Sequence, residues 1–431
     1  QGGGPAMSLT IGMIVDEIFG LDAPFRLKAY DGSSSGDDNA VVTMHLKNER
    51  GLRYLVTAPG ELGVVRAYVQ GDLDIVGLDE GDPYELIDTV KDALSVRIPE
   101  PRKVKEIVAS LGPKMFVPPA LPELENPPGW RRLAEGLRHS KERDARAISH
   151  HYDVSNAFYE LVLGPSMAYT CACYPRDDAT LEEAQEHKFD LVARKLGLRP
   201  GMRLLDVGCG WGGMVRHAVR NYGVTALGVT LSREQAAYGQ EWIEREGLRG
   251  RAEIRHSDYR DVTESGFDAV SSIGLTEHIG VKNYPGYFAF LSERLRDGGL
   301  LLNHSITRPS TAYGSVQRGG FINRYVFPDG ELAPVGAIIT AMAEQGFEIR
   351  HAEDLREHYA RTCRAWARNL SANYAAAVSE AGQSAARVWG LYLAGSSLGF
   401  ARNEIQLHQV LGQKVGAEGV AAYPLRPRFE D

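Results

Sequence analysis

The chain has 431 residues, enough for two or three domains, and its 43% hydrophobic and 24% charged residues are typical of a globular protein. Its 48 Lys and Arg against 56 Asp and Glu give a net charge of −8, which argues against nucleic acid as a partner. Four cysteines without metal-like pairing predict free thiols in a reducing compartment, and no apolar run approaches the roughly 18 residues of a membrane-spanning helix.

The N-terminal part of the sequence predicts a small α+β domain. Residues 1–6 precede Met7 and are interpreted as a remnant of cloning. Hydrophobic periodicity then predicts a helix over 8–20, strands over 25–30, 41–46 and 54–58, a turn at 31–36, and the end of a helix within 68–74. Residues 7–96 contain no catalytic cluster, so we expect this domain to have a structural or lipid-associated role.

Residues 97–129 are rich in proline, at positions 99, 101, 113, 118, 119, 122, 127 and 128. That density predicts an extended linker between two domains. Between Arg102 and Arg146, ten Lys and Arg stand against six Asp and Glu, in a chain that is acidic overall. This basic stretch is interpreted either as a surface for anionic lipid headgroups or as an ordinary solvated helix face.

A glycine-rich turn begins the second half of the chain. Leu204–Gly213 predicts a strand, a turn with glycines at 208, 210 and 212, and the start of a helix that continues to Tyr222. The turn lacks the Lys of a phosphate loop and the spacing of a dinucleotide fingerprint. It suits S-adenosylmethionine (SAM), which has no phosphate and whose cationic end Asp206 would favour. A plain tight turn is the alternative.

Strands and helices alternate through the rest of the chain. We expect a helix over 181–196, strands over 226–230, 252–255, 267–272 and 299–304, a helix opening at 231–235 with Ser232 as N-cap, and helices over 334–346, 353–382 and 383–401. This order predicts an α/β fold, a Rossmann-like class I methyltransferase sheet with helices on both faces, over 130–431. Polar residues follow the strands at one edge of that sheet, where ligands bind: Asp206, Thr230, Asp258, Glu277, His278 and His304.

Seven motifs, in this order, resemble the cyclopropane fatty acid synthase family, which includes the mycolic acid cyclopropane synthases. They are His151-Tyr-Asp-Val-Ser155, Tyr169-Thr-Cys171, Asp206-Val-Gly-Cys-Gly-Trp-Gly-Gly213, Gly228-Val-Thr-Leu-Ser232, Asp258-Tyr-Arg-Asp261, Glu277-His-Ile-Gly280 and Tyr325-Val-Phe-Pro328. The resemblance covers residues 145–412. The N-terminal block is similar, more weakly, to the smaller domain of the family, which implies a role in phospholipid binding and in a homodimer.

The resemblance implies methyl transfer from SAM to the cis double bond of an unsaturated phospholipid acyl chain, through a carbocation deprotonated by a bound bicarbonate ion. The implied bicarbonate site consists of the Cys171 and Ile306 main chains and the side chains of Glu277, His304 and Tyr325. The implied cofactor residues are Tyr152, Ser155, Tyr169, Thr170, Asp206, Gly208, Gly210, Trp211, Gly212, Thr230, Leu231, Gln235, Asp258 and Tyr259. No metal site is expected, since His150 and His151 lack a third ligand at a metal-like spacing.

Several alternatives stay open. Thr276 stands where the family often has Phe, so the product is either a cyclopropane or a 10-methylene branch that a partner reductase would reduce. We favour the branch as a hypothesis, because the turn Tyr30-Asp-Gly-Ser33 and the composition are similar to actinobacterial relatives. A small-molecule methyltransferase would share the glycine turn without the bicarbonate residues, and a noncatalytic lipid-binding protein would have lost Glu277 or His304. The expected location is cytoplasmic, peripherally on the inner face of the membrane.

Overall fold

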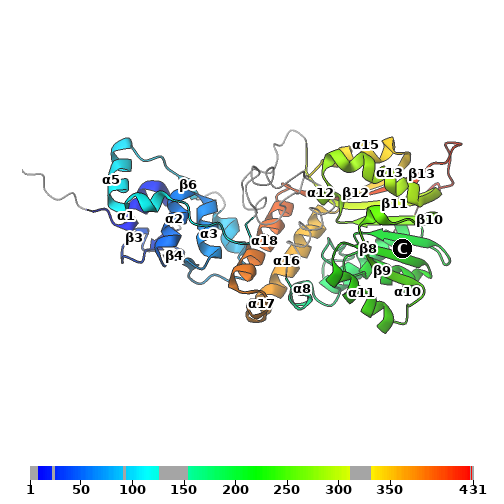
Figure 1. Cartoon of the computed structure of the whole chain (residues 1–431), viewed down its shortest axis with the longest axis horizontal. Helices are drawn as coiled ribbons and strands as arrows, with labels where there is room; N and C mark the ends of the chain where they lie inside the picture. Colours follow the sequence, from blue (N-terminus) through cyan, green and yellow to red (C-terminus); the bar gives the residue numbers. More distant parts are fainter. Residues whose placement is uncertain are drawn as a thin grey trace, which may run out of the picture. The chain divides into compact units, whose positions relative to one another are not determined.

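The structure is a computed structural model that describes residues 8–21, 25–90, 94–125, 154–310, 332–427 and 429. Its elements form two compact units (Figure 1). The first unit combines the N-terminal segment with Leu370–Gly395, and the second holds the other described residues from 154 onward.

A four-stranded sheet and short helices make up the first unit. The sheet has the order β3-β2-β4-β5, and a separate antiparallel pair joins β1 to β6. The elements are α1 (Ile11–Ile18), β1 (Phe19–Leu21), β2 (Phe25–Lys28), β3 (Ser34–Gly36), β4 (Val42–Leu46), α2 (Glu49–Thr57), α3 (Glu61–Val69), β5 (Leu73–Ile75), α4 (Tyr84–Val90), β6 (Leu94–Val96), α5 (Pro101–Leu111), the 3₁₀ helix η1 (Pro113–Phe116), α17 (Tyr374–Ala381) and most of α18 (Gln383–Ala401).

Most elements expected here are confirmed, but the strand predicted over 54–58 is wrong. These residues belong largely to helix α2. Asn48 caps the helix by accepting a hydrogen bond from the Gly51 N–H at 2.9 Å, and the buried Leu52 and Leu55 are three residues apart. The cap and this helical spacing outweigh the strand preference of a short run of aromatic and β-branched residues.

The expectation of an extended linker over 97–129 is wrong for α5. Pro101 occupies the first helical position, where its missing N–H is no loss, and Gly112 ends the helix with a φ of +77°. Farther along, the Glu125 carboxylate accepts hydrogen bonds from Arg66 Nε and Nη2 at 2.7 and 2.5 Å. The described part of the proline-rich segment therefore packs on the first unit.

A distant part of the chain completes the first unit. Arg387 of α18 donates to the Tyr68 carbonyl at 2.7 Å and pairs with Asp74 at 2.9 Å and Glu80 at 2.6 Å. Its side chain is almost fully buried. The helical pattern over 383–401 predicted α18 but gave no sign of this attachment.

The second unit contains a seven-stranded sheet in the order β12-β13-β11-β10-β7-β8-β9. The pairs from β11 to β9 are parallel, whereas β13 is antiparallel to both β11 and β12. The elements are α8 (Asn156–Leu163), α9 (Leu181–Lys195), β7 (Arg203–Val207), α10 (Gly213–Tyr222), β8 (Thr225–Thr230), α11 (Arg233–Arg245), β9 (Ala252–His256), η2 (Tyr259–Asp261), β10 (Phe267–Ile273), α12 (Thr276–Ile279), η3 (Val281–Asn283), α13 (Tyr284–Arg294), β11 (Leu295–Thr307), α15 (Val335–Glu344), β12 (Phe347–Asp354), α16 (Arg356–Ala372) and β13 (Gln406–Lys414).

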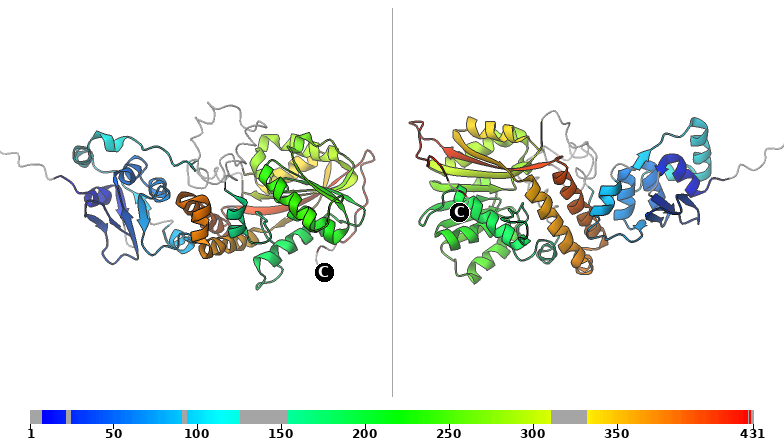
Figure 2. Two further views of the ribbon diagram at one scale, coloured as in Figure 1. Left: turned by 60° about the horizontal axis from the view of Figure 1, so that its bottom comes forward. Right: turned by 180° about the vertical axis from the view of Figure 1, so that it is seen from behind.

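The α/β fold and its five parallel strands are confirmed, and Figure 2 shows helices on both faces of the sheet. The helix expected over 353–382 is wrong in part. Its first residues end strand β12, and α16 and α17 are separate helices that meet at Asn373. The sequence prediction also lacked β13, because its buried apolar residues Leu407, Val410 and Leu411 are interspersed with glutamine, histidine and glycine and do not alternate regularly.

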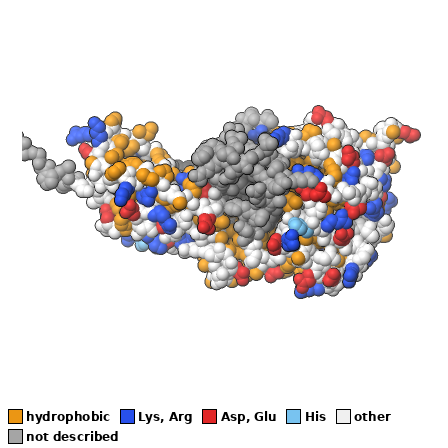
Figure 3. All heavy atoms as spheres, viewed as in Figure 1, with side chains coloured by type: hydrophobic (Ala, Val, Ile, Leu, Met, Phe, Trp, Pro, Cys, Tyr) orange, Lys and Arg blue, Asp and Glu red, His pale blue; other side chains and the backbone are white. Residues whose placement is uncertain are grey.

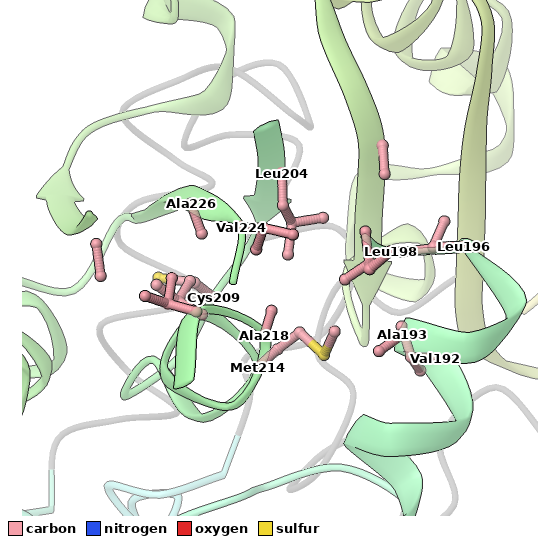
Figure 4. Close-up of a cluster of buried hydrophobic side chains, with 14 of the residues drawn as sticks. Val192, Ala193, Leu196, Leu198, Leu204, Cys209, Met214, Ala218, Val224 and Ala226 are labelled. Carbon is pink, nitrogen blue, oxygen red and sulfur yellow. The ribbon is translucent and has the colours of Figure 1, made fainter. Parts of the chain in front are cut away.

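Apolar side chains of α9, α10 and α11 cover one face of the sheet, and those of α13 and α15 cover the other. Figure 4 shows the first of these clusters, in which Cys209 and Met214 join Leu204 and Ala226. The glycine turn is thus anchored in the core at both of its ends. Within the described ranges, no helix combines the length and the apolarity that a membrane crossing requires.

Candidate functional site

The glycine turn after β7 is held in a conformation that requires glycine. Gly208, Gly210 and Gly212 have φ values of +72°, +56° and +86°. The Gly208 and Cys209 N–H groups both donate to the Val229 carbonyl, at 3.0 and 2.9 Å, which fixes the turn to β8. A Cβ on Gly212 would lie 2.0 Å from an Ile254 carbon, whereas one on Gly210 would meet no atom of the described residues within 4 Å. The backbone at Gly210 is therefore open to a ligand.

Several of the cofactor residues implied by the family resemblance follow β8 and β9 at the ends of these strands. The Thr230 hydroxyl donates to Gln235 Oε1 at 2.8 Å, and both side chains are buried. Ser232 caps α11 as predicted, by accepting from the Gln235 N–H at 3.2 Å. Leu231 lies between Thr230 and Ser232 in the chain. Asp258 instead holds its own neighbour, Arg260, through an ion pair at 2.7 Å.

Aromatic side chains join helix α8 to the glycine turn. Trp211 donates from its indole N–H to Asn156 Oδ1 at 3.0 Å, and its ring is 4.8 Å from Tyr159. Tyr169 continues this chain of rings at 5.8 Å from Tyr159. Ser155 acts as the N-cap of α8, by accepting from the Phe158 N–H at 3.1 Å. Asn156 and Tyr159 were not predicted, although Asn156 directly follows the first family motif.

Asp206 and Lys188 are buried beneath the turn. Burial raises the pKa of Asp206 to about 7. The hydrogen bond from Ser271 at 2.8 Å and the positive charge of Lys188 lower this pKa, but their effect is smaller than that of burial. Burial also lowers the pKa of Lys188 to about 8. The Lys188 ammonium donates to the Thr170 hydroxyl at 2.6 Å and to the Cys171 carbonyl at 3.3 Å, so it orders the second motif. Within the sequence, Lys188 looked like an ordinary helix residue.

Gly274 brings the predicted catalytic residues together at the end of β10. Its N–H donates to the His304 carbonyl at 2.7 Å, and its φ is +76°. A Cβ there would lie 2.9 Å from Thr170 Cγ2 and 3.8 Å from Glu277 Oε1. A Cβ on Gly208 would lie 3.5 Å from the side chain of Leu275. The glycine turn, the second motif and the Glu277 loop therefore adjoin.

Glu277 and His304 each have a buried polar atom without a partner. They are 5% and 1% exposed, and neither Glu277 Oε2 nor His304 Nε2 has a hydrogen-bond partner among the described residues. Burial raises the pKa of Glu277 to about 8, although its own N–H and that of Ile306 donate to the carboxylate. Burial, with the charges of Lys188 and Lys195, lowers the pKa of His304 well below its usual range. Both side chains are therefore neutral near pH 7.

The remaining predicted residues are placed less directly. Tyr152 and Tyr325 lie outside the described residues. The buried Cys171 thiol is within 3.8 Å of the Leu355 carbonyl, and burial raises its pKa well above the usual range, so it is a neutral packed group. Tyr259 packs edge-on against Tyr287 at 5.1 Å.

Thr276 points away from the Glu277 and His304 pair. Its hydroxyl accepts a hydrogen bond from Asn303 Nδ2 at 3.3 Å. Asn303 and His304 are successive residues of β11, so their side chains lie on opposite faces of the sheet.

Comparison with known proteins identifies the family. The model for mycolic acid cyclopropane synthetase matches residues 139–410. The probable fatty acid methyltransferase Rv3720 of Mycobacterium tuberculosis is 56% identical over 407 residues, which covers 94% of this chain and 95% of that protein. The cyclopropane synthase MmaA2 of the same organism has a TM-score of 0.60 at 32% identity, over 64% of this chain and 99% of its own. The mycolic acid cyclopropane synthase CmaA1, complexed with SAH and CTAB, has a TM-score of 0.59 at 33% identity, with the same shares covered.

The matched residues include the glycine turn, the polar strand ends and the buried Glu277 and His304. The relative with the highest identity given above extends the match through the first unit as well. The chain belongs to the mycolic acid cyclopropane synthetase family and is a SAM-dependent methyltransferase.

Proposed function

We propose that the enzyme methylates the cis double bond of an unsaturated fatty acyl chain carried by a phospholipid, and forms a cyclopropane or a 10-methylene branch. One observation carries the proposal: the unpartnered atoms of Glu277 and His304 are buried next to the glycine turn. The names of the relatives, a fatty acid methyltransferase and two cyclopropane synthases, support the acyl substrate.

The residues at the strand ends fit SAM. The open backbone at Gly210 admits the methionine part, and the Thr230–Gln235 pair offers hydroxyl and amide groups for a ribose. SAM supplies an electrophilic methyl group bound to a sulfonium. The neighbouring Asp206, at a pKa of about 7, gains its charge most readily when a cation is near.

The residues also fit a small anion such as bicarbonate. Glu277 and His304 are both neutral near pH 7, so neither repels a negative charge, and each has an unpartnered buried atom. Bicarbonate, when bound, would supply the base that removes a proton from the methylated carbocation. Glu277 would hold the anion by its acidic proton at Oε2 and exchange that proton with it. The buried surroundings exclude water, which would otherwise quench a carbocation.

The surface of the first unit supports a membrane-bound substrate. Val104 and Val108, one turn apart on α5, are 42% and 39% exposed, and Ile98 is 95% exposed. Lys105 and Lys114 are also exposed and have no ion pair among the described residues. In Figure 3 hydrophobic side chains gather over this face, with Lys and Arg at its border. An apolar face with basic neighbours suits peripheral contact with an anionic lipid surface. A homodimer and a reductase that acts on the product remain predictions.

Expression in a host with oleoyl phospholipids, followed by gas chromatography–mass spectrometry of the fatty acid esters, tests the proposal. We expect an ester heavier by one CH₂ than oleate, and its fragmentation distinguishes a cyclopropane from a methylene branch. A cyclopropane alone would exclude the branched product that we favour. Unchanged lipids, together with a methylated small molecule, would overturn the proposal in favour of a small-molecule methyltransferase.

A further inference from the structure

Two buried residues, Gln409 and Lys195, lie next to the Nδ1 atom of His304, on the opposite side of the ring from the unpartnered Nε2. His304 on β11 is directly opposite Gln409 on β13, and its Nδ1 is 3.1 Å from Gln409 Nε2. The Lys195 ammonium donates to Gln409 Oε1 at 2.8 Å and also pairs with Glu353 of β12. His304, Gln409 and Lys195 are each no more than 2% exposed. They form one buried chain of contacts that ends at a partly exposed carboxylate.

The chemistry of these groups assigns the proton on His304. An ammonium group only donates hydrogen bonds, so the atom of Gln409 that faces Lys195 is the amide oxygen. The amide NH₂ then faces His304 Nδ1, and because an NH₂ group also only donates, Nδ1 must be the acceptor. A neutral imidazole with an accepting Nδ1 carries its proton on Nε2.

The same contacts oppose an imidazolium. A proton on Nδ1 would face the NH₂ group of Gln409, and Lys195 and Lys188 add positive charge nearby. Glu277, the acidic group in this part of the site, is neutral near pH 7. His304 therefore presents a neutral N–H at Nε2, the atom that has no partner among the described residues.

We propose that Gln409 and Lys195 are positioning residues that hold His304 as an Nε2–H donor, so that His304 binds an anionic group in the site and does not act as the base. The identity of that anion rests on the proposed function, but the assignment of the proton does not. Glu353 anchors Lys195 and thereby fixes which way the amide of Gln409 faces.

The most direct test is nitrogen-15 NMR of protein labelled at histidine, with the His304 signals assigned by their loss in His304→Asn. We expect the wild-type protein to show a protonated Nε2. Gln409→Glu replaces the NH₂ group by a carboxylate oxygen, which accepts a hydrogen bond from Nδ1–H. At about pH 8, the proton of the neutral imidazole should therefore be on Nδ1 in this variant. Protonated Nδ1 in the wild-type protein would overturn the proposal, even if Gln409→Glu does not fold.

Activity gives a second readout. At about pH 8 Gln409→Glu should lose about tenfold or more in kcat, because the anion loses a buried hydrogen bond. Toward about pH 6 the variant forms an imidazolium and regains the Nε2–H donor, so its activity relative to wild type should rise. A merely structural defect would not recover in this way. A constant ratio of activities would contradict the positioning role.

Matched variants separate this effect from a general loss of packing. Gln413 is also on β13 and buried at 2% exposure, but its amide bonds Arg350 and the carbonyls of Gly298 and Ala422. Gln413→Met should leave the His304 signals unchanged, whereas Gln409→Met should leave a mixture of tautomers. If the proton is on Nε2 as expected but turnover does not depend on bicarbonate, the proposed anion fails and this inference stands.

Discussion

Two buried acids, Glu125 in the first unit and Glu277 in the second, show how differently one side-chain type is used. Both Glu125 oxygens accept from one guanidinium, that of Arg66, in a two-bond contact. Within the described ranges, no cation pairs with Glu277 and its Oε2 has no partner, and burial raises its pKa to about 8. A fully paired buried charge stabilises one arrangement of the chain, whereas an incompletely paired one remains available for a ligand.

The largest expected effect tests the unpartnered acid. Glu277→Gln keeps the size and the hydrogen-bonding capacity of a neutral carboxylic acid, but an amide does not exchange a proton. We expect kcat on phospholipid vesicles to fall by about a hundredfold or more, while SAM affinity measured by calorimetry stays near that of the wild type. Unchanged turnover would refute the role of Glu277.

The second prediction tests the paired acid. Arg66→Met leaves the Glu125 charge buried without its partner, which should cost about 3–5 kcal/mol of the unfolding free energy of the first unit. The double variant Arg66→Met/Glu125→Leu should recover most of that loss. Chemical denaturation of the three proteins provides the measurement. If the double variant is as unstable as the single one, the loss of unfolding free energy comes mainly from lost packing of Arg66 and not from the unpaired charge of Glu125.

Gly274→Ala tests whether the Glu277 site depends on close packing. The new methyl group would be 2.9 Å from Thr170 Cγ2, at a φ of +76° that disfavours alanine. We expect the free energy of unfolding to fall by about 1–2 kcal/mol. We also expect kcat to fall, because the new methyl group displaces residues of the Glu277 site. Gly346 has a similar φ of +87°, and a new methyl group there would meet no atom within 4 Å in the described ranges, so Gly346→Ala should share the strain and keep full activity. Equal kinetic effects of the two variants would contradict this account.

The last prediction concerns pH. The pKa of Glu277 is about 8 in the folded protein and has an ordinary value of 4.5, so between these values the folded state binds more protons than the unfolded state. The contribution of Glu277 to stability therefore falls as pH rises through that window. Glu277→Gln lacks this titration, so its Tm should rise relative to wild type from about pH 5 to about pH 8. A Tm difference that is independent of pH would place the Glu277 pKa outside the window.

The sequence predicted the sheet and the acids at its edge because those features depend on local pattern. Parallel strands place their carboxyl ends at one edge, so Thr230 and Glu277 could be assigned from order alone. Gln409 and Lys195 could not. Gln409 contacts His304 only because β13 returns antiparallel beside β11, and Lys195, at the end of α9, contacts Gln409. In the sequence, a glutamine within a strand or a lysine at the end of a helix resembles a surface residue.

The first unit was less predictable for a similar reason. Its strands are short, and Leu370–Gly395 joins it from the other end of the chain through Arg387. The helix α5 also depends on its caps, Pro101 and Gly112, in a segment whose proline content indicated an extended chain. The proline content predicted an extended linker, but the positions of Pro101 and Gly112 allow residues 101–111 to form helix α5.

The central claim is that the buried pair Glu277 and His304 serves methyl addition to an acyl double bond. Incubating the purified enzyme with SAM that carries a trideuterated methyl group and with vesicles of an unsaturated phospholipid tests it directly. Mass spectrometry should find two deuterons in the acyl chain for either product, because ring closure and formation of a methylene branch each remove one deuteron from the transferred methyl group. Glu277→Gln should lower the rate at which the labelled product forms by about a hundredfold or more. Acyl chains without deuterium, or equal labelling by the wild-type and variant enzymes, would contradict the account.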